Sequence, residues 1–248
     1  MDASPPLHIA FTMNCEGASS RGSTSAPRSW EQGARTIGAF CGRLLDFGFP
    51  PTLFVAPDCA EEQAPMLEEL ASRGCELGLF LSPAAVSDGR YRQPFGAFSA
   101  PQQRELVEVA AERFESALGI QPRSFRAQHY SASDHTFRTL FELGFRQGSL
   151  SSPGRDSRRE HAVWRGTDPD AHHVDPASKL RAGAMPFLEL PVTTNYKQIQ
   201  MICAASYRPH HYTRLYSHPW NRLPTPPAET PAVAPPAAPA TPEATTHA

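Results

Sequence analysis

The stretch PTLFVAPDCAEEQAPMLEELASRGCELGLFLSP, from Pro51 to Pro83, contains one complete strand–helix–strand unit. Its first apolar run, TLFV, has the length of a buried strand and is followed closely by a proline. A helical pattern follows over EEQAPMLEELASR and stops at Gly74, a residue type that commonly ends helices. The second apolar run, CELGLFL, again has strand length. Two strands joined through a helix predict parallel pairing in a sheet covered by helices.

The same unit repeats on both sides of this stretch. Strand-length runs occur in LHIAFTM, SFRA, FRQGSL, PFLELPV and TRLYSHP. Helical patterns lie in WEQGARTIGAFCGRLLDFG, APQQRELVEVAAERFESALG and SDHTFRTLFELG, and we expect Ser29 and Ser133 to be the N-caps of the first and last. Residues 151–185, with many Arg, Asp and Gly, are predicted to be loop. The chain is therefore predicted to be α/β, either a barrel or a doubly wound sheet, with its site at the carboxyl ends of the strands.

Composition limits the function classes. The net charge of −2 does not indicate the excess of basic residues that is typical of nucleic-acid-binding proteins. No apolar run approaches the roughly 18 residues that span a bilayer. The start MDASPPLHIAF lacks a positively charged region before an apolar core, so we expect no signal peptide and a cytoplasmic protein. The five cysteines are scattered without a CxxC pair, which favours reduced thiols over a disulfide framework or a zinc knuckle.

The last 26 residues differ sharply in composition. Residues 223–248 are almost entirely Pro, Ala, Thr and Glu, too poor in apolar surface to offset the entropy of ordering them. We expect residues 1–222 to form one domain and residues 223–248 to be a disordered tail. The tail is either an inert terminus or a tether to a protein partner.

Chemically informative residues gather at the predicted carboxyl ends of the strands. In chain order they are Asn14, Cys15, Glu16, Asp58, Phe80, Ser82, Arg126, His129, Tyr130, Thr193, Thr194, Asn195 and His218.

This order of residues resembles the polysaccharide deacetylase family, the NodB homology domain of carbohydrate esterase family four. The resemblance runs from about His8 to Asn221. The stretch 51–83 is similar to the family's second strand, helix and histidine-bearing strand, and SFRAQHYSASDHTFRTLFELGFRQGSLSSPG is similar to its Arg-containing third motif. FLELPVT and YSHPW match the fourth and fifth motifs. The resemblance implies a deformed, seven-stranded (β/α) barrel that removes acetyl groups from sugars, with a divalent metal held by one carboxylate and two histidines.

Four positions depart from the family's metal-site pattern. Asn14 stands at the position of the base aspartate, and an amide does not accept a proton near neutral pH. Cys15 stands at the position of the metal-binding aspartate. Phe80 and Ser82 stand where the family has histidines, and neither a phenyl ring nor a lone hydroxyl is a good zinc ligand. We therefore expect no metal at these degenerate positions.

Two positions match the family. Arg126 corresponds to the third-motif arginine that orients the base, and His218 corresponds to the fifth-motif histidine that protonates the leaving group. Each has a structural alternative: an ion pair or carbonyl contacts for Arg126, and a histidine with satisfied hydrogen bonds near a Pro-Trp turn for His218. Glu16 follows the first motif and is either a metal ligand or a loop acid that caps a turn.

Further residues are candidates for contact with a sugar. His129 and Tyr130 follow Arg126 in the same loop. The segment DPDAHHVDP supplies His172 and His173, predicted on a loop that touches sugar rather than chelating a metal. Trp164 and Trp220 could stack on a sugar ring or pack in the core.

Two hypotheses of different class follow. In the first, a deacetylase-like barrel has lost metal hydrolysis and binds a carbohydrate or nucleotide-sugar, or serves as a scaffold, with no cofactor. In the second, an active hydrolase cleaves non-peptide C–N or ester bonds of acylated sugars through an altered site. That site would contain Glu16, Cys15, His218 and the His172–His173 segment, with zinc or another divalent metal.

Overall fold

The computed structural model describes residues 8–17, 27–192 and 212–216. The helices are α1 (Trp30–Asp46), α2 (Pro57–Ser72), α3 (Pro83–Val86), α4 (Ala100–Leu118) and α5 (Thr136–Glu142), with short 3₁₀ turns η1 (Phe95–Ala97), η2 (Gln128–Tyr130) and η3 (Arg158–Glu160). The strands are β1 (His8–Cys15), β2 (Thr52–Val55), β3 (Glu76–Leu81), β4 (Ser124–Ala127), β5 (Gln147–Gly148), β6 (Asp156–Ser157), β7 (Ala162–Val163), β8 (His172–Asp175), β9 (Ser178–Ala182), β10 (Met185–Glu189) and β11 (Tyr212–Tyr216).

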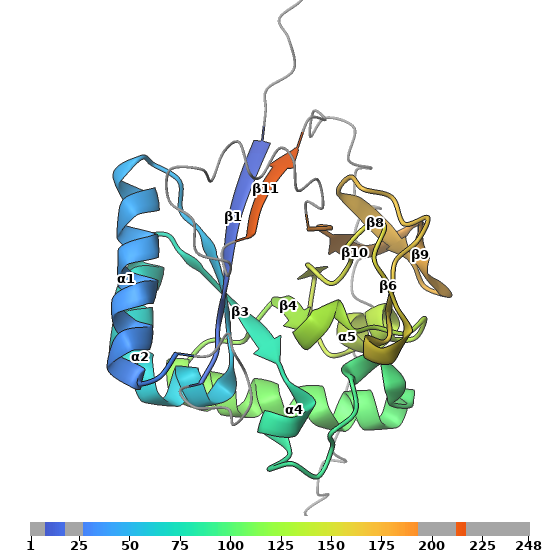
Figure 1. Ribbon diagram of the computed structural model, residues 1–248, viewed down its shortest axis with the longest axis horizontal. Coiled ribbons are helices and arrows are strands. Elements are labelled where there is room, and N and C mark those ends of the chain that lie inside the picture. The colour runs from blue at the N-terminus through green and yellow to red at the C-terminus, as the bar shows by residue number, and fades with distance from the viewer. Residues whose placement is uncertain (1–7, 18–26, 193–211, 217–248) are drawn as a thin grey trace, which may run out of the picture.

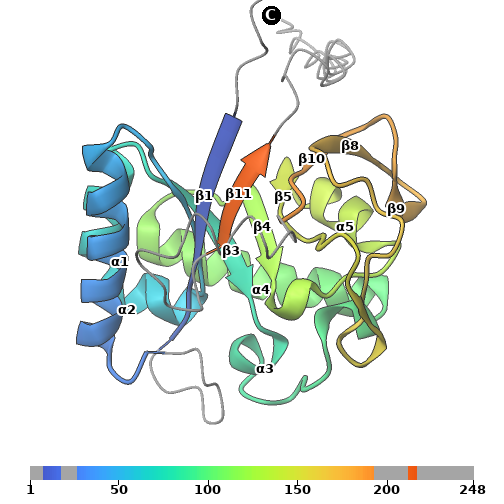
Figure 2. The same cartoon turned by 45° about the horizontal axis from the view of Figure 1, so that its top comes forward.

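One nine-stranded sheet forms the centre of the fold, in the order β11-β1-β2-β3-β4-β5-β10-β8-β9. Strands β1 to β5 and β10 pair in parallel, and β11 runs antiparallel beside β1 at one edge, as Figures 1 and 2 both show. The antiparallel pair β8–β9 extends the other edge. Among the described residues the sheet therefore has nine strands, two more than the seven that the resemblance implied. The α/β class and the parallel βαβ units are confirmed.

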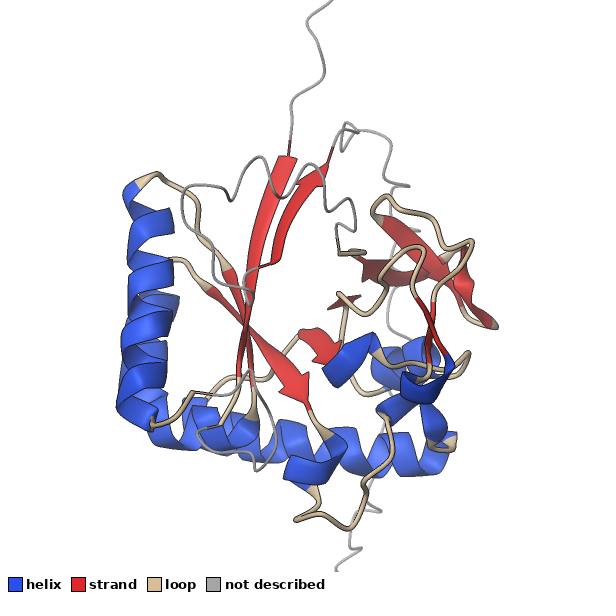
Figure 3. Ribbon diagram, viewed as in Figure 1, coloured by secondary structure: helices blue, strands red, loops and turns tan. Residues whose placement is uncertain are grey.

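Helices α1, α2 and α4 lie along the outside of the sheet (Figure 3). Their apolar sides meet the outward side chains of the strands, among them Leu53, Leu79 and Phe125, which are fully buried. Because side chains alternate along a strand, the residues between these point to the opposite, inner face. That inner face carries the polar residues described below.

Most sequence predictions of the elements hold, and two are wrong. Ser29 caps α1, with its hydroxyl accepting from the N–H of Gln32. Ser133 is not the N-cap of α5, which begins at Thr136 after His135; the Ser133 N–H donates to Oγ1 of Thr136 in the turn before the helix. Residues 151–185 are not a loop throughout, since they contain β6, β7, β8 and β9. Hydrogen bonds in the turn before α5 explain the first difference, and pairing of β6 with β7 and of β8 with β9 and β10 explains the second.

Candidate functional site

Arg126 is the centre of a polar network on the inner face of the sheet. Its side chain is fully buried at 0% exposure. Nη2 donates to Oγ1 of Thr12 at 3.0 Å and to Oγ of Ser149 at 2.8 Å, and Nε donates to the carbonyl of Ser149 at 3.2 Å. The guanidinium carbon lies 4.0 Å from the centre of the Phe54 ring. The arginine therefore ties β1, β2, β4 and the residue after β5 together at one level of the sheet.

Asn14 completes this network at the end of β1. Nη1 of Arg126 donates to Oδ1 of Asn14 at 3.0 Å. Thr12 and Asn14 are two residues apart and so share the inner face. The structure thus brings together the two residues that the resemblance aligned with the base and its orienting arginine, with an amide in place of a carboxylate.

Phe80 and Ser82 lie at the end of the neighbouring strand β3. Phe80 is directly opposite Arg126 in the β3–β4 register and is 1% exposed. Its ring belongs to the apolar core and presents no donor atom. The hydroxyl of Ser82 donates to Oε1 of Gln128 at 3.1 Å, in the turn that follows β4.

Cys15 faces the helices rather than the inner face of the sheet. Its side chain is 2% exposed and lies near Cys59 of α2 and Cys41 of α1. Burial, followed by these neighbouring thiols, raises the pKa of Cys15 well above its usual range. The expectation that Cys15 shares a site with Asn14 is therefore wrong, because adjacent residues of a strand point to opposite faces.

Glu16 and Asp58 form a carboxylate pair where β1 and β2 end. Burial raises the pKa of Glu16, and the nearby charge of Asp58 raises it further. Burial also raises the pKa of Asp58, although the N–H of Cys59 and the charge of Arg113 oppose the shift. A Cβ added at Gly17 would lie 1.8 Å from Oδ2 of Asp58, so the carboxylate occupies the space above that glycine. The sequence placed Asp58 at a strand end but did not pair it with Glu16.

His129 and Tyr130 occupy a turn at the end of β4 in which both have positive φ, 60° and 59°. Left-handed backbone is uncommon outside glycine, and two such residues in succession indicate a constrained turn. Tyr130 is 6% exposed, and its ring centre lies 5.8 Å from the guanidinium carbons of both Arg126 and Arg155. The His129 side chain is half exposed, with Nδ1 3.6 Å from Oε1 of Glu160. Of these two predicted sugar contacts, only His129 is presented to solvent.

His172 and His173 lie on strand β8 and not on a loop, so that prediction is wrong. His172 is 5% exposed, and its Nδ1 lies 2.7 Å from the carbonyl of Asp170. His173 is partly buried, with Nδ1 3.2 Å from the carbonyl of Met185. Trp164 is fully buried and packs against Phe137, so core packing accounts for it. Pairing of β8 with β10 removes the His172 ring from the surface.

Glu189, which the sequence analysis did not single out, holds the end of β5 in place. It is fully buried on β10, and its Oε1 accepts from the N–H groups of Leu150 and Ser151 and from the Ser151 hydroxyl. Its Oε2 has no hydrogen-bond partner among the described residues. The same segment carries Ser149, a partner of Arg126. The sequence feature that could have indicated this role is the single acidic residue, Glu189, inside the otherwise apolar run FLELPV.

Several predicted site residues lie outside the described residues. They are Thr193, Thr194, Asn195, His218 and Trp220, and the predicted tail 223–248 lies outside as well.

The residues present do not fit the metal that the resemblance implies. Of the four aligned residues, Asn14 contacts Arg126 and Cys15 faces the helices. Phe80 is buried, and Ser82 contacts Gln128. Within residues 8–17, 27–192 and 212–216, no three His, Cys, Asp or Glu side chains converge into a metal-binding group.

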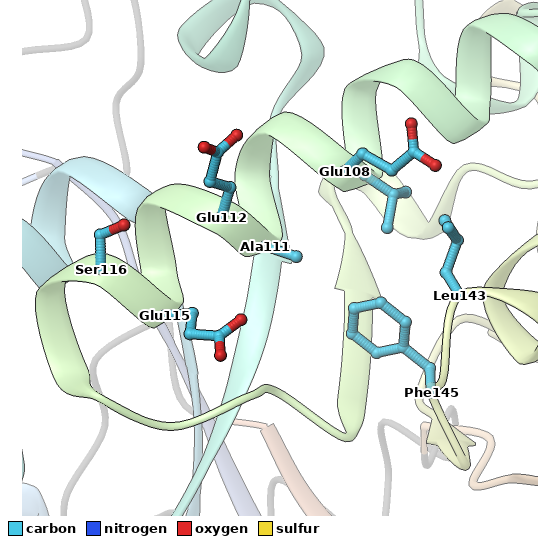
Figure 4. A pocket seen from close by; sticks show the side chains of 8 residues that line it. Glu108, Ala111, Glu112, Glu115, Ser116, Leu143 and Phe145 are labelled. Carbon is cyan, nitrogen blue, oxygen red and sulfur yellow. The ribbon is translucent and has the colours of Figure 1, made fainter. Parts of the chain in front are cut away.

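A groove of about 400 Å³ lies elsewhere, between the outer side of α4 and the segment from Leu143 to Phe145 (Figure 4). Apolar residues that line it include Val107 and Phe145. The acidic residues that line it are Glu108, Glu112 and Glu115. Phe145 precedes β5, so the groove is at the end of the fold where the strands begin. It is therefore separate from the network around Arg126.

None of the described helices is long and apolar enough to span a lipid bilayer.

The fold and the site together define an α/β protein with a largely parallel sheet, covered by helices and polar on its inner face near the strand ends. Its fold is the NodB-like fold of the polysaccharide deacetylases of carbohydrate esterase family four, as the sequence resemblance indicated. A structure from Mycobacterium smegmatis assigned as a polysaccharide deacetylase matches with a TM-score of 0.50 and 21% identity over 74% of this chain. No protein-family model matches the sequence, and comparison with curated proteins finds no match.

Two further structures, both assigned to carbohydrate esterase family four, match at lower similarity. A family four carbohydrate esterase from Streptomyces lividans matches with a TM-score of 0.41 and 11% identity over 58% of this chain. A family four pseudoenzyme from Bacillus anthracis matches with a TM-score of 0.40 and 12% identity over 55% of this chain. The chain spans 58% of the length of the Mycobacterium smegmatis structure, 62% of the Streptomyces lividans structure and 40% of the Bacillus anthracis structure.

Proposed function

We propose that this protein is a deacetylase-like carbohydrate-binding protein in which metal-dependent deacetylation has been lost. The observation that carries the proposal is the hydrogen bond from Arg126 to Asn14, beside the buried ring of Phe80. A carboxylate at position 14 could activate water, whereas an amide held by an arginine cannot accept the proton. At position 80, where the family has a metal-binding histidine, this chain has the apolar side chain of Phe80.

The remaining surface at the strand ends suits a polyol. The amide of Asn14, the hydroxyl of Ser82 and the half-exposed imidazole of His129 are all polar groups that form hydrogen bonds. Sugars are bound through such groups, which both donate and accept hydrogen bonds to hydroxyls. The proposed ligand is a carbohydrate or nucleotide-sugar. A scaffold role, a cytoplasmic location and a tail-bound protein partner remain predictions of the sequence.

Three measurements on the purified protein test the proposal: its zinc content, its deacetylation of acetylated amino-sugar oligomers, and its thermal shift with a panel of sugars. We expect no stoichiometric metal, no acetate release, and stabilisation by at least one sugar that is weakened by Asn14→Ala. Stoichiometric zinc, lost together with activity in Glu16→Gln, would contradict the loss of hydrolysis. No shift with any sugar would contradict carbohydrate binding and favour a scaffold.

One observation favours the hydrolase alternative. Glu16 and Asp58 are adjacent carboxyl groups whose pKa values are raised by burial at the ends of β1 and β2. Carboxyl groups with raised pKa values can act as general acids near neutral pH. Acetate release that disappears in Glu16→Gln would support that reading.

A further inference from the structure

The segment from Arg155 to Arg165 contains more basic than acidic residues and lies against the loop at the end of β4. It has four arginines and two acidic residues, in a chain whose overall net charge is −2. It comprises the β6–β7 hairpin with the η3 turn at its tip. We call this segment the arginine hairpin.

The arginine hairpin is fixed to the site loop by several hydrogen bonds. The N–H of Ala132 donates to the carbonyl of His161 at 3.1 Å. Nε1 of Trp164 donates to the carbonyl of Tyr130 at 2.8 Å. Within the hairpin itself, the N–H of Trp164 donates to the carbonyl of Arg155 at 2.8 Å. His129 lies 3.6 Å from Glu160 of the η3 turn. The hairpin is therefore held beside the turn that carries His129 and Tyr130.

Both acids of the hairpin are engaged with arginines within it. Asp156 lies 2.9 Å from Arg165, and Glu160 forms an ion pair with Arg155. Burial acts to raise the pKa of Glu160, but hydrogen bonds from Arg155 and Ser157 and the charges of Arg155 and His129 leave it lowered. The acid thus stays ionised and holds Arg155. Two consecutive arginines, Arg158 and Arg159, are left exposed.

Arg158 and Arg159 form no ion pair within the described part of the chain. Guanidinium groups bind carboxylates through paired hydrogen bonds and raise the local concentration of anionic ligands. We propose that the arginine hairpin forms an anion-binding rim of the candidate site, and that the carbohydrate bound there is an acidic saccharide bearing uronate carboxylates. This inference rests on the proposed carbohydrate-binding function and specifies its ligand.

The test compares a galacturonate hexamer with cellohexaose, a neutral hexamer, by calorimetric titration of the full chain. We expect the acidic hexamer to bind more tightly and to weaken with added salt, because exposed charges are screened. The double variant Arg158→Gln/Arg159→Gln should lose roughly tenfold in affinity for the acidic hexamer and keep its affinity for the neutral one. Both positions are exposed, so the variant should fold, which its thermal transition verifies.

The matched control is Arg43→Gln/Arg123→Gln, which removes the same charge from two exposed arginines at the end of the fold where strands begin. It should leave both affinities unchanged. Equal loss in both double variants would overturn the inference, because net charge alone would then explain binding.

Other outcomes separate this inference from the proposed function. If cellohexaose binds as well as the acidic hexamer and the Arg158→Gln/Arg159→Gln variant is unaffected, the acidic ligand is wrong and carbohydrate binding stands. If neither hexamer nor any sugar of the thermal-shift panel binds, both fail. Binding of a mannose phosphate without the galacturonate hexamer would overturn the uronate assignment, and equal affinity for oligouridylate would overturn a saccharide ligand.

Discussion

Nη1 of the buried Arg126 donates to Oδ1 of Asn14 at 3.0 Å, across the strands that separate β4 from β1. The two residues are 112 positions apart in the chain. This contact places an amide where a proton acceptor would be needed, and several consequences can be measured.

Asn14→Asp should stabilise the protein at neutral pH by about 1 kcal/mol, because a carboxylate beside a guanidinium makes a stronger hydrogen bond than an amide. The introduced carboxyl should have a lowered pKa, so the gain is present above the pKa of the unfolded chain and is lost as pH falls. Urea unfolding at neutral and acid pH checks this. An equal gain at both pH values would contradict it.

Asn14→Asp alone should release no acetate from acetylated amino-sugar oligomers, because Phe80 still fills the wall of the site. Adding Phe80→His and Ser82→His supplies imidazoles at the aligned positions. Zinc binding measured on the triple variant, with the wild type as control, tests the alignment of β3. If the folded triple variant binds no zinc, the alignment of this strand is wrong.

Arg126→Gln should destabilise the protein by about 3 kcal/mol, because Thr12, Ser149 and Asn14 all lose a buried donor. Arg35→Gln is the matched control, since its side chain is 67% exposed and forms its ion pair with Glu31 on the preceding turn of α1. Its effect should stay within about 0.5 kcal/mol. Chemical denaturation of both variants gives the comparison, and similar losses would contradict a special role for Arg126.

Glu189→Gln should cost about 2 kcal/mol, because three donors from Leu150 and Ser151 converge on one carboxyl oxygen and the amide that replaces the carboxyl group is a weaker acceptor. Hydrogen exchange at the Leu150 and Ser151 amides should accelerate. Glu115→Gln, on the exposed side of α4, is the control and should change neither stability nor exchange at these amides. Unchanged protection in the Glu189 variant would show that the carboxylate does not hold this segment.

Stability should fall as pH rises through the range above the ordinary carboxyl pKa, through the contribution of Glu16 and Asp58. Both pKa values are raised in the folded protein, first by burial. The folded state therefore holds more protons than the unfolded state in that range, and each proton lost costs stability. Glu16→Gln should flatten this part of the stability–pH curve. An unchanged curve would contradict the assignment.

The βαβ pattern of the fold could be predicted because it depends on local periodicity. The apolar runs around Leu53 and Leu79 and the glycines that end α2 and α4 mark the elements without any knowledge of tertiary contacts. The segment from 151 to 185 could not be predicted in this way. Its strands are short, and they form only by pairing with one another and with β10: β6 with β7, and β8 with β9 and β10.

The sequence by itself determined which residues stand at the strand ends, Asn14, Phe80 and Ser82 among them, because identity and order along the strands are local facts. Only the tertiary structure decided which side chains meet. Strand alternation sends Cys15 to the helices and Asn14 to Arg126, pairing of β8 with β10 buries His172, and Glu189 reaches the segment that carries Ser149. The physical reason is that residues distant in sequence share a face of the sheet only once the register of every intervening strand is fixed.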